Sequence, residues 1–285
     1  MRVIVIGAGF VGKPLCELME GAGHHVVRVT RNGADSSVAC DVSNLESLTM
    51  LREGKGVADI VVHCASSGGI GTDRAIRYQQ VYVDGCNNII ETFPDSRFVF
   101  VSSSSVYGQR DGSVVDEESI AKPLSVTSQL LLRAESITSE FGGSIARLAG
   151  IYGPRRSYLL KKYIEKNAQI DGNESDSDGR WINQIHRDDA ASALAHMVEK
   201  SEMNGIYNVC DDTPMLQRVC YEEFDRRFKH GLPEVKPAIE SKARGWTHKR
   251  VSNSKLKETG WVPKYPSYFD ALDKDNELLS SIIGV

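Results

Sequence analysis

A glycine-rich turn close to the N-terminus constrains the fold of this chain more than any other feature. The apolar run VIVI leads directly into GAGFVG at residues 7–12, and an amphipathic segment follows. Between a strand and a helix, Gly7 permits a tight turn, Gly9 lets a diphosphate approach the backbone, and Gly12 lets the helix pack closely on the strand. The N-terminus of that helix offers unpaired N–H groups to the phosphates. The sequence therefore predicts a dinucleotide-binding turn, with a glycine turn used only for packing as the alternative.

Short apolar runs alternate with amphipathic segments through the first half of the chain. We expect strands over Arg2–Ile6, His25–Thr30, Asp59–His63, Arg97–Ser102 and Ser144–Arg147, and helices over Phe10–Glu20, Leu45–Arg52, Arg74–Thr92 and Val126–Phe141. Because VIVI, IVVH and FVFV are apolar at successive positions, both faces of these strands should be covered. Repeated strand–helix–strand order predicts an α/β fold with a doubly wound parallel sheet.

The alternation of strands and helices breaks near Ile151. Beyond it we expect a helix over Tyr158–Asn167, a polar segment DGNESDSDG at residues 171–179, a helix from Asp188 and a strand over Gly205–Cys210. The acidic residues of DGNESDSDG lack the glycine and glutamate positions of a calcium-binding loop, so we expect a solvated turn there. The chain is therefore divided into a nucleotide-binding domain over residues 1–150 and a smaller substrate-binding lobe over residues 151–285, packed against the first.

Composition and charge argue against several classes of partner. Hydrophobic residues make up 41% and charged residues 25%, as in ordinary soluble proteins, and the formal net charge is −4. This charge gives no reason to expect a nucleic-acid or anionic-membrane partner, and no apolar run is long enough for a signal peptide or a membrane span. The six cysteines are scattered without CxxC or zinc-ligand spacing, so we expect reduced thiols, no metal site and a cytoplasmic protein. The expected partner is a small-molecule substrate, and a homodimer is left open.

The end of the second expected strand favours NADP over NAD. An NAD site usually carries an acidic residue there, whose carboxylate bonds the ribose hydroxyls and repels a 2′-phosphate. This chain has Val29-Thr30-Arg31-Asn32 instead. Thr30 removes the repulsion, and the planar guanidinium of Arg31 can pair with the phosphate. A solvated surface position is the alternative for Arg31.

Two further segments should line the cofactor crevice, because the carboxyl ends of parallel strands meet at one edge of the sheet. These segments are CDVS at residues 40–43 and HCAS at residues 63–66. The carboxylate of Asp41 can accept a hydrogen bond from an adenine amino group, or it can cap the helix that begins near Asn44. The residues alone leave both roles open.

Seven motifs follow one another along the chain: GAGFVG, CDVS, HCAS, SSSSVYG (102–108), RLAGIYGP (147–154), IHRDD (185–189) and VSNSKLKETGWVP (251–263). In this order they resemble the extended short-chain dehydrogenases/reductases, the NAD-dependent epimerase/dehydratase family, which acts mostly on nucleotide sugars. The resemblance covers essentially the whole chain. It implies a Rossmann domain followed by a smaller C-terminal substrate lobe. It also assigns Asp41 to adenine and makes Ser103 the catalytic hydroxyl that holds the substrate oxygen.

The resemblance fails at the usual catalytic pair. The family places Tyr-x-x-x-Lys on the helix after SSSSVYG, usually with a Glu four residues after the Lys. Glu135 then sets the register and puts Thr127 and Leu131 where Tyr and Lys are expected. A tyrosine needs a nearby cation to act as an acid or base near neutral pH, and Thr with Leu does not replace that pair. The chain therefore resembles an atypical branch of the family.

Two other positions depart from the family pattern. Tyr82 stands where the family often has an Asn. The Tyr-x-x-x-Lys that the sequence does contain, from Tyr158 to Lys162, comes after RLAGIYGP rather than before it. We interpret it as a coincidence on an amphipathic helix at the start of the smaller lobe.

The motifs and the resemblance together nominate the site residues. The catalytic candidates are Ser103, Ser105 and Tyr107, of which Tyr107 is more readily a packing residue. The cofactor candidates are Gly7, Gly9, Phe10, Val11, Gly12, Thr30, Arg31, Asp41, Val42, Cys64, Ala65, Ser66, Ser102, Thr127 and Leu131. Thr127 and Leu131 are expected beside the nicotinamide and its ribose.

Three functions are compatible with these residues. The first is an NADP(H)-dependent oxidoreductase or epimerase/dehydratase-like enzyme that acts on a small molecule such as a sugar or nucleotide sugar. The second is a non-catalytic NADP-binding redox sensor or regulatory protein. The third is a structural subunit in which the cofactor is only a stabilising ligand. Hydride transfer from bound NADPH to a carbonyl substrate would distinguish the first from the others.

Overall fold

Seven parallel strands form the central sheet of the larger lobe. The computed structural model describes residues 1–68, 73–172, 178–238 and 246–283. In spatial order the strands are β12 (Gly205–Val209), β7 (Ser144–Leu148), β5 (Arg97–Ser103), β4 (Ile60–His63), β1 (Arg2–Ile6), β2 (His25–Thr30) and β3 (Val38–Ala39). The chain runs outward from β1 to β3 and then returns to β4 on the other side of β1, so the strand order reverses there. The predicted α/β fold with a doubly wound parallel sheet is confirmed.

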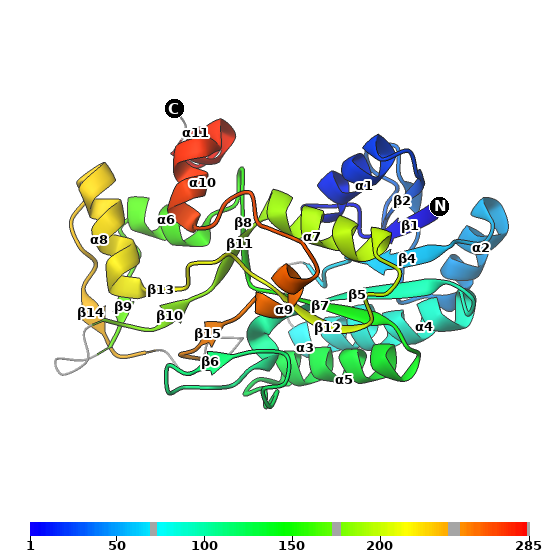
Figure 1. Cartoon of the computed structure of the whole chain (residues 1–285), viewed down its shortest axis with the longest axis horizontal. Coiled ribbons are helices and arrows are strands. Elements are labelled where there is room, and N and C mark those ends of the chain that lie inside the picture. The colour runs from blue at the N-terminus through cyan, green and yellow to red at the C-terminus, as the bar shows by residue number, and fades with distance from the viewer. Residues whose placement is uncertain (69–72, 173–177, 239–245, 284–285) are drawn as a thin grey trace.

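Helices cover both faces of this sheet (Figure 1). Helices α1 (Gly12–Gly21) and α7 (Arg187–Glu199) pack against each other on one face. The other face carries α2 (Leu45–Lys55), α3 (Arg74–Tyr78), the π-helical turn η1 (Gln79–Asp84), α4 (Gly85–Thr92) and α5 (Val126–Glu140). Strands between two helix layers bury side chains on both of their faces, which requires apolar residues at successive positions.

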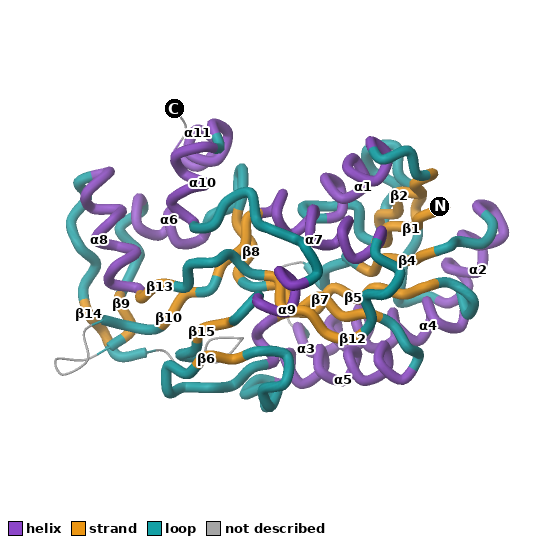
Figure 2. Tube along the Cα trace, in the orientation of Figure 1, coloured by secondary structure: helices purple, strands orange, loops and turns teal. Residues whose placement is uncertain are grey.

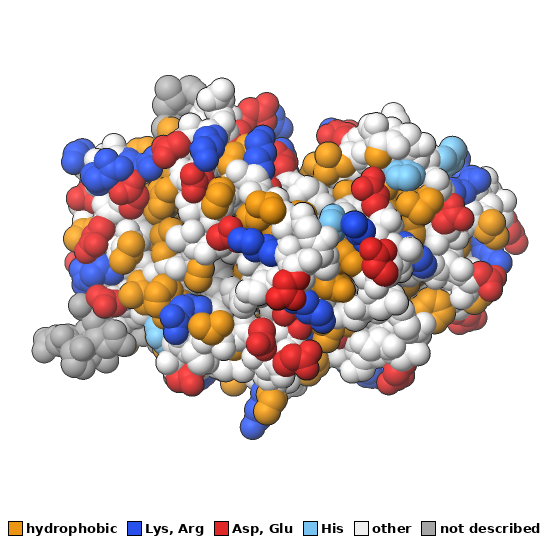
Figure 3. Space-filling view, in the orientation of Figure 1, with side chains coloured by type: hydrophobic (Ala, Val, Ile, Leu, Met, Phe, Trp, Pro, Cys, Tyr) orange, Lys and Arg blue, Asp and Glu red, His pale blue; other side chains and the backbone are white. Residues whose placement is uncertain are grey.

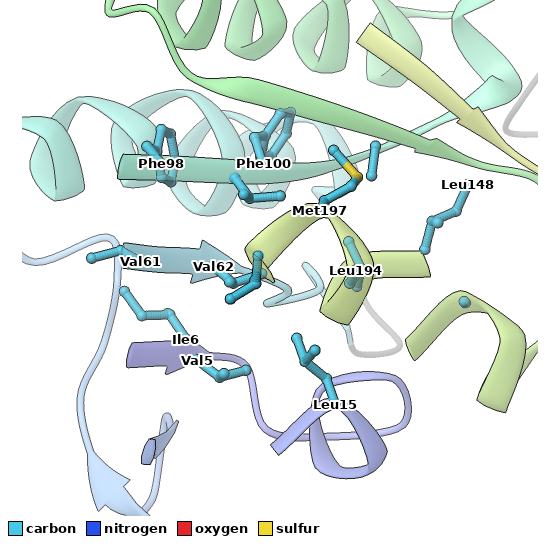
Figure 4. Packing of buried hydrophobic residues seen from close by; sticks show 14 of the residues in the cluster. Val5, Ile6, Leu15, Val61, Val62, Phe98, Phe100, Leu148, Leu194 and Met197 are labelled. Atoms are coloured by element: carbon cyan, nitrogen blue, oxygen red, sulfur yellow. The ribbon is translucent and has the colours of Figure 1, made fainter. Parts of the chain in front are cut away.

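The core between these layers accounts for the apolar runs of the sequence. Side chains of Val3–Ile6 and Ile60–Val62 are at most 2% exposed. Figure 4 shows Leu15 of α1 and Leu194 of α7 beside these strands. Full burial of a side chain of this size stabilises the fold by about 1.5–3 kcal/mol. The prediction that both faces of these strands are covered is therefore confirmed.

The smaller lobe is built from short strand pairs and has its own apolar core. Its helices are α6 (Tyr158–Ile164), α8 (Gln217–Phe228), α10 (Tyr268–Lys274) and α11 (Asn276–Ile283). Its strands pair as β8 (Gly150–Tyr152) with β11 (Gln184–His186), β10 (Trp181–Ile182) with β13 (Met215–Leu216), and β9 (Ile170–Asp171) with β14 (Val235–Lys236). In its core the ring of Tyr268 lies 4.5 Å from that of Tyr152 and 5.6 Å from that of Phe224, between centroids.

The two lobes lie side by side (Figure 2). The outline of the molecule is notched between α10–α11 and α1 (Figure 3). The remaining elements are the pair β6 (Val114–Val115) and β15 (Arg250–Val251), the 3-10 turn η2 (Ser104–Val106), and α9 (Ser254–Glu258). None of the helices in the described part of the chain combines the length and the apolar character that crossing a membrane requires.

The chain returns to the larger lobe after its first passage through the smaller one. Strand β12 pairs with β7 in the central sheet, and α7 packs on α1, so both belong to the layers of the larger lobe. We therefore propose that residues 187–209 belong to the larger lobe, in place of the single boundary after residue 150 that the sequence suggested. The turn expected at residues 171–179 falls mainly on residues 173–177, which lie outside the described residues.

The helix expected over Arg74–Thr92 contains a π turn that the sequence did not indicate. Elements α3, η1 and α4 follow one another without a break. The fully buried His63 of β4 places Nε2 at 2.9 Å from the Val81 carbonyl oxygen, inside the π turn. Burial lowers the pKa of His63 to about 4, so its imidazole is neutral near pH 7. Because the partner of this turn, His63, lies on strand β4 and is distant in sequence, the local sequence pattern does not reveal the π turn.

Candidate cofactor and active site

A cavity of about 540 Å³ lies where the strand order of the sheet reverses. Its wall is formed by residues at the carboxyl ends of the parallel strands, including Ile6 of β1, Thr30 of β2, Ser103 of β5 and Leu148 of β7. The crevice outside these strand ends is where open α/β sheets bind nucleotides. A cavity of this size is within the usual range for a cofactor or small-molecule site.

The glycine turn at one wall of the cavity has the geometry expected from the sequence. Gly7 has a φ of +95°, and a Cβ atom there would lie 2.3 Å from the backbone nitrogen of Ala65. A Cβ atom on Gly12 would lie 2.2 Å from the carbonyl oxygen of Gly7, so Gly12 lies behind the turn and serves close packing. A Cβ atom on Gly9 would meet nothing within 4 Å, and this open side lets a ligand approach the backbone.

The backbone of the turn presents donors to the cavity. The N–H groups of Gly7 and Ala8 both donate to the Val29 carbonyl at 2.9 Å, which holds the turn against β2. Phe10 and Val11 line the cavity and precede α1, and their N–H groups have no backbone acceptor among the described residues. These free donors at a helix N-terminus match what a diphosphate requires.

The loop after β2 is folded around the hydroxyl of Thr30. Its Oγ1 accepts a hydrogen bond from the N–H of Ala34 at 3.1 Å and lies 2.5 Å from Oγ of Ser37. Ser37 in turn donates to the Ala34 carbonyl. Arg31 follows Thr30 on the cavity wall, is exposed, and makes no ion pair or hydrogen bond within the described residues. Its guanidinium is therefore available to an anion at this end of the cavity.

Asp41 lines the cavity and does not cap a helix. Its Oδ1 accepts hydrogen bonds from the backbone N–H of Ser43 at 3.0 Å and from the Ser43 hydroxyl at 2.7 Å. Helix α2 is capped by Asn44, whose side chain accepts from the N–H of Ser47 at 2.9 Å. The helix-cap interpretation of Asp41 is therefore wrong. Val42, Cys64, Ala65 and Ser66 lie on the same cavity wall.

Two of the three catalytic candidates line the cavity. Ser103 and Ser105 are both on its wall. Oγ of Ser103 accepts from the N–H of Ser105 at 3.2 Å, and Oγ of Ser128 donates to Oγ of Ser105 at 3.1 Å. The Ser103 hydroxyl hydrogen is not needed by this contact, so it can be donated to a substrate oxygen.

Tyr107, the third catalytic candidate, does not line the cavity. It is fully buried, and its hydroxyl donates to the carbonyl of Asp116 at 2.7 Å. The same hydroxyl accepts a hydrogen bond from Nη1 of Arg147 at 2.8 Å and lies 3.0 Å from Oδ1 of Asn208. Burial raises the pKa of Tyr107 above its ordinary value. We therefore correct its assignment from a catalytic to a packing residue.

A buried ion pair lies beside strand β5. Nη2 of Arg147 lies 2.7 Å from Oε2 of Glu135, and each side chain is 3% exposed. Nε of Arg147 also donates to the same carboxylate, and the Ser102 hydroxyl donates to Glu135 Oε1 at 2.6 Å. Glu135 of α5 thus points toward the sheet and ties β5 and β7 together.

Thr127 and Leu131, which stand at the expected Tyr and Lys positions, differ in whether they line the cavity. Leu131 is 4% exposed and forms part of the cavity wall. Thr127 is also buried but is not on that wall, and its Oγ1 lies 3.1 Å from Oγ of Ser125, which caps α5. Thr127 sits in the first turn of α5, so its short side chain bonds to the cap. The structure brings Leu131 to the cavity but leaves Thr127 off its wall.

Neither Tyr158 nor Lys162 is on the cavity wall. Tyr158 is 69% exposed on α6, and the Lys162 amine lies 4.6 Å from the centre of its ring. Among the described residues, His, Cys, Asp and Glu side chains do not group in threes that could hold a metal ion.

Several residues that the structure places on the cavity wall were not nominated from the sequence, and three of them have side chains that can contact a ligand through a ring or a charge. Tyr78 and Tyr82, one turn apart near the π turn, and Arg156, after β8, all line the cavity. The Tyr82 hydroxyl accepts from the N–H of Ser67 at 3.3 Å. The spacing of Tyr78 and Tyr82 by four residues was a visible signal, whereas Arg156 lies in an irregular loop that carries none.

Comparisons with known proteins agree with this geometry. Residues 3–210 match the model of the family described as NAD dependent epimerase/dehydratase family. Protein YeeZ of Escherichia coli (strain K12) is 24% identical over 284 residues, which cover 93% of this chain and 96% of YeeZ. The protein named "Uncharacterized UDP-glucose epimerase YtcB" of Bacillus subtilis (strain 168) is 26% identical over 201 residues, which cover 58% of this chain and 63% of YtcB.

Solved structures show the same fold over nearly the whole chain. UDP-glucose 4-epimerase of Thermus thermophilus in complex with NAD is 20% identical, with a TM-score of 0.80 and coverage of 100% of both chains. The human epimerase family protein SDR39U1 (isoform 2) with NADPH is 17% identical, with a TM-score of 0.75 and coverage of 96% of this chain and 98% of that one. At these identities the likeness establishes the architecture of both lobes.

Proposed function

Because the chain belongs to the NAD-dependent epimerase/dehydratase family, we propose that it is an NADP(H)-dependent oxidoreductase or epimerase/dehydratase-like enzyme acting on a sugar or nucleotide sugar. The residues of the cavity fit a dinucleotide, since the open face of Gly9 and the free N–H groups of Phe10 and Val11 match a diphosphate. When bound, the nicotinamide would supply or accept a hydride. Relatives whose names include UDP-glucose support the substrate class.

The observation that carries the NADP preference is the available guanidinium of Arg31 beside Thr30. Asp41 is the one acidic residue on the described cavity wall, and its Oδ1 is engaged by Ser43. On the cavity wall, the loop after β2 therefore presents the guanidinium of Arg31, while the one carboxylate of this loop, Asp35, is exposed and is not on that wall. A charged phosphate–arginine pair with two parallel hydrogen bonds is among the stronger polar contacts that proteins make.

Replacing Arg31 with Gln should weaken NADPH binding by about 10- to 100-fold, because hydrogen bonds to charged groups contribute about 1.5–3 kcal/mol. NADH affinity should change little, since NADH lacks the 2′-phosphate. Calorimetric titration of both cofactors measures these effects. Arg28→Gln on the same strand is the matched control, because Arg28 pairs with Glu20 at 2.6 Å and is not on the cavity wall. Equal affinities of the native protein for NADPH and NADH would refute the preference.

We assign the substrate-holding role in catalysis to the Ser103 hydroxyl. It stands on the cavity wall beside Ser105, and Leu131 occupies the wall where a lysine would otherwise support a tyrosine. Loss of a positioned acid or hydrogen-bond donor typically costs about 10²–10⁴-fold in rate, so a site without the Tyr–Lys pair can still turn over.

With a panel of sugar and keto-sugar carbonyls, we expect NADPH consumption that falls by about 10²-fold or more in Ser103→Ala. Ser104→Ala is the matched control, because Ser104 is in the same turn but not on the cavity wall. The second candidate function is a non-catalytic NADP-binding regulatory protein. Tight NADPH binding without hydride transfer to any carbonyl of the panel would support a regulatory protein, which the apolar Leu131 position also permits.

A further inference from the structure

The loop between β8 and α6 brings a second arginine to the cavity from the smaller lobe. The guanidinium carbon of Arg156 lies 4.9 Å from the centre of the Phe10 ring, and Arg156 is on the cavity wall. Phe10 belongs to the glycine turn of the larger lobe and directly follows Gly9. The ring thus holds the guanidinium from the smaller lobe beside the segment that presents free backbone donors, by a cation–π contact.

The contact depends on a close approach of the two lobes at Gly153. A Cβ atom on Gly153 would lie 2.9 Å from Cβ of Arg187 and 3.3 Å from Cζ of Phe10. Backbone hydrogen bonds between Gly153 and Arg156, at 2.9 Å in both directions, close the loop. Glycine at this position therefore allows the loop to fold directly over the Phe10 ring.

Arg156 differs in its setting from the other arginine beside the ring. The guanidinium of Arg187 lies 5.7 Å from the centre of the Phe10 ring but is not on the cavity wall, whereas Arg156 is. The basic side chains of the described cavity wall are Arg31, at the end of β2, and Arg156, at the glycine turn. The two cations are therefore associated with different parts of a bound dinucleotide.

We propose that Arg156 binds the diphosphate of the dinucleotide, together with the N–H groups of Phe10 and Val11, so that the cofactor joins the two lobes. This inference rests on the proposed dinucleotide site, but not on the NADP preference or on catalysis. The diphosphate carries charge that the backbone donors alone do not neutralise, and a planar guanidinium offers two parallel donors to its oxygens. In this proposal Arg31 binds the 2′-phosphate, which only NADPH carries. Arg156 binds the diphosphate, which NADPH, NADH and ADP-ribose share.

Calorimetric titration of NADPH, NADH and ADP-ribose into four forms of the full chain tests this division. In Arg156→Gln, all three affinities should fall by a similar factor of about 10- to 100-fold. In Arg31→Gln, only NADPH should be affected. Arg155→Gln removes the same charge from the neighbouring exposed position, which is not on the cavity wall, and should stay within about twofold of the native protein.

Hydrogen exchange supplies a readout that a merely structural role would not change. Saturating ADP-ribose should slow exchange of the Gly153 and Arg156 amides in the native protein, because the loop becomes pinned to the ligand. In Arg156→Gln, at a higher ADP-ribose concentration that saturates this variant as well, the same two amides should be less protected from exchange. Arg156→Lys, which keeps the charge but loses the planar fork, should bind with intermediate affinity and shows whether a misfolded loop explains the Gln variant.

Native-like binding of ADP-ribose by Arg156→Gln would overturn the inference, as would a loss of affinity confined to NADPH. Failure of the native protein to bind NADPH, NADH or ADP-ribose would overturn it together with the proposed function. If NADPH and NADH bind the native protein equally and Arg156→Gln weakens both, the NADP preference fails and the role of Arg156 stands.

Discussion

Replacing Glu135 with Gln should lower the free energy of unfolding by about 3–5 kcal/mol, because it leaves the buried guanidinium of Arg147 without its counter-charge. Both side chains are 3% exposed, so water does not reach the uncompensated charge. Denaturation by urea measures the loss. Glu140→Gln, at the exposed end of the same helix, should change stability by no more than about 0.5 kcal/mol. A loss below about 1 kcal/mol for Glu135→Gln would show that solvent or a rearranged neighbour satisfies Arg147.

A double variant separates the ion pair from the packing around it. Removing both charges, as in Glu135→Gln with Arg147→Met, should cost less than the sum of the two single changes. The coupling should fall in the range of about 0.5–3 kcal/mol that side chains in one network show. The remaining loss reports mainly on the Tyr107 hydroxyl, which loses its Arg147 donor but keeps Asp116 and Asn208, because the glutamine amide oxygen can still accept from Ser102. Strict additivity would contradict the idea that these groups act as one network.

The second large effect is expected at Gly12. A Cβ atom there would lie 2.2 Å from the Gly7 carbonyl oxygen, so Gly12→Ala must displace the glycine turn from the helix. Two or more N–H donors would then lose their alignment with a diphosphate. At about 1.5–3 kcal/mol for each charged hydrogen bond, affinity for NADPH and NADH alike should fall by more than about 100-fold.

Two other glycines provide the controls for this measurement. Gly21→Ala at the opposite end of α1 meets nothing within 4 Å and should bind cofactor as the native protein does. Gly9→Ala also has room for its Cβ atom, so we expect a native fold with weakened binding, because the methyl group projects toward the ligand. Native affinity in Gly12→Ala, measured by calorimetry, would mean that the turn can move without affecting the donors.

The sequence predicted which residues at the strand ends line the cavity, but it did not predict side-chain contacts between segments that are distant in sequence. Thr30 and Asp41 were predictable as cavity residues because each follows a buried strand or its loop, and parallel strands end at one edge. Tyr107 was misassigned because its partners come from segments separated by as many as 101 positions, which no local pattern reveals. Arg156 was missed for the same reason, since its closeness to Phe10 depends on how the lobes meet.

The late return of the chain to the central sheet has a consequence for folding during synthesis. Strand β7 ends at Leu148, but its neighbour β12 does not begin until Gly205. Until the ribosome has produced β12, one edge of β7 has unpaired backbone N–H and C=O groups, although it will be an interior strand of the finished sheet. Chains truncated between these strands should therefore aggregate through that open edge, and a chaperone that protects the nascent chain would act during this interval.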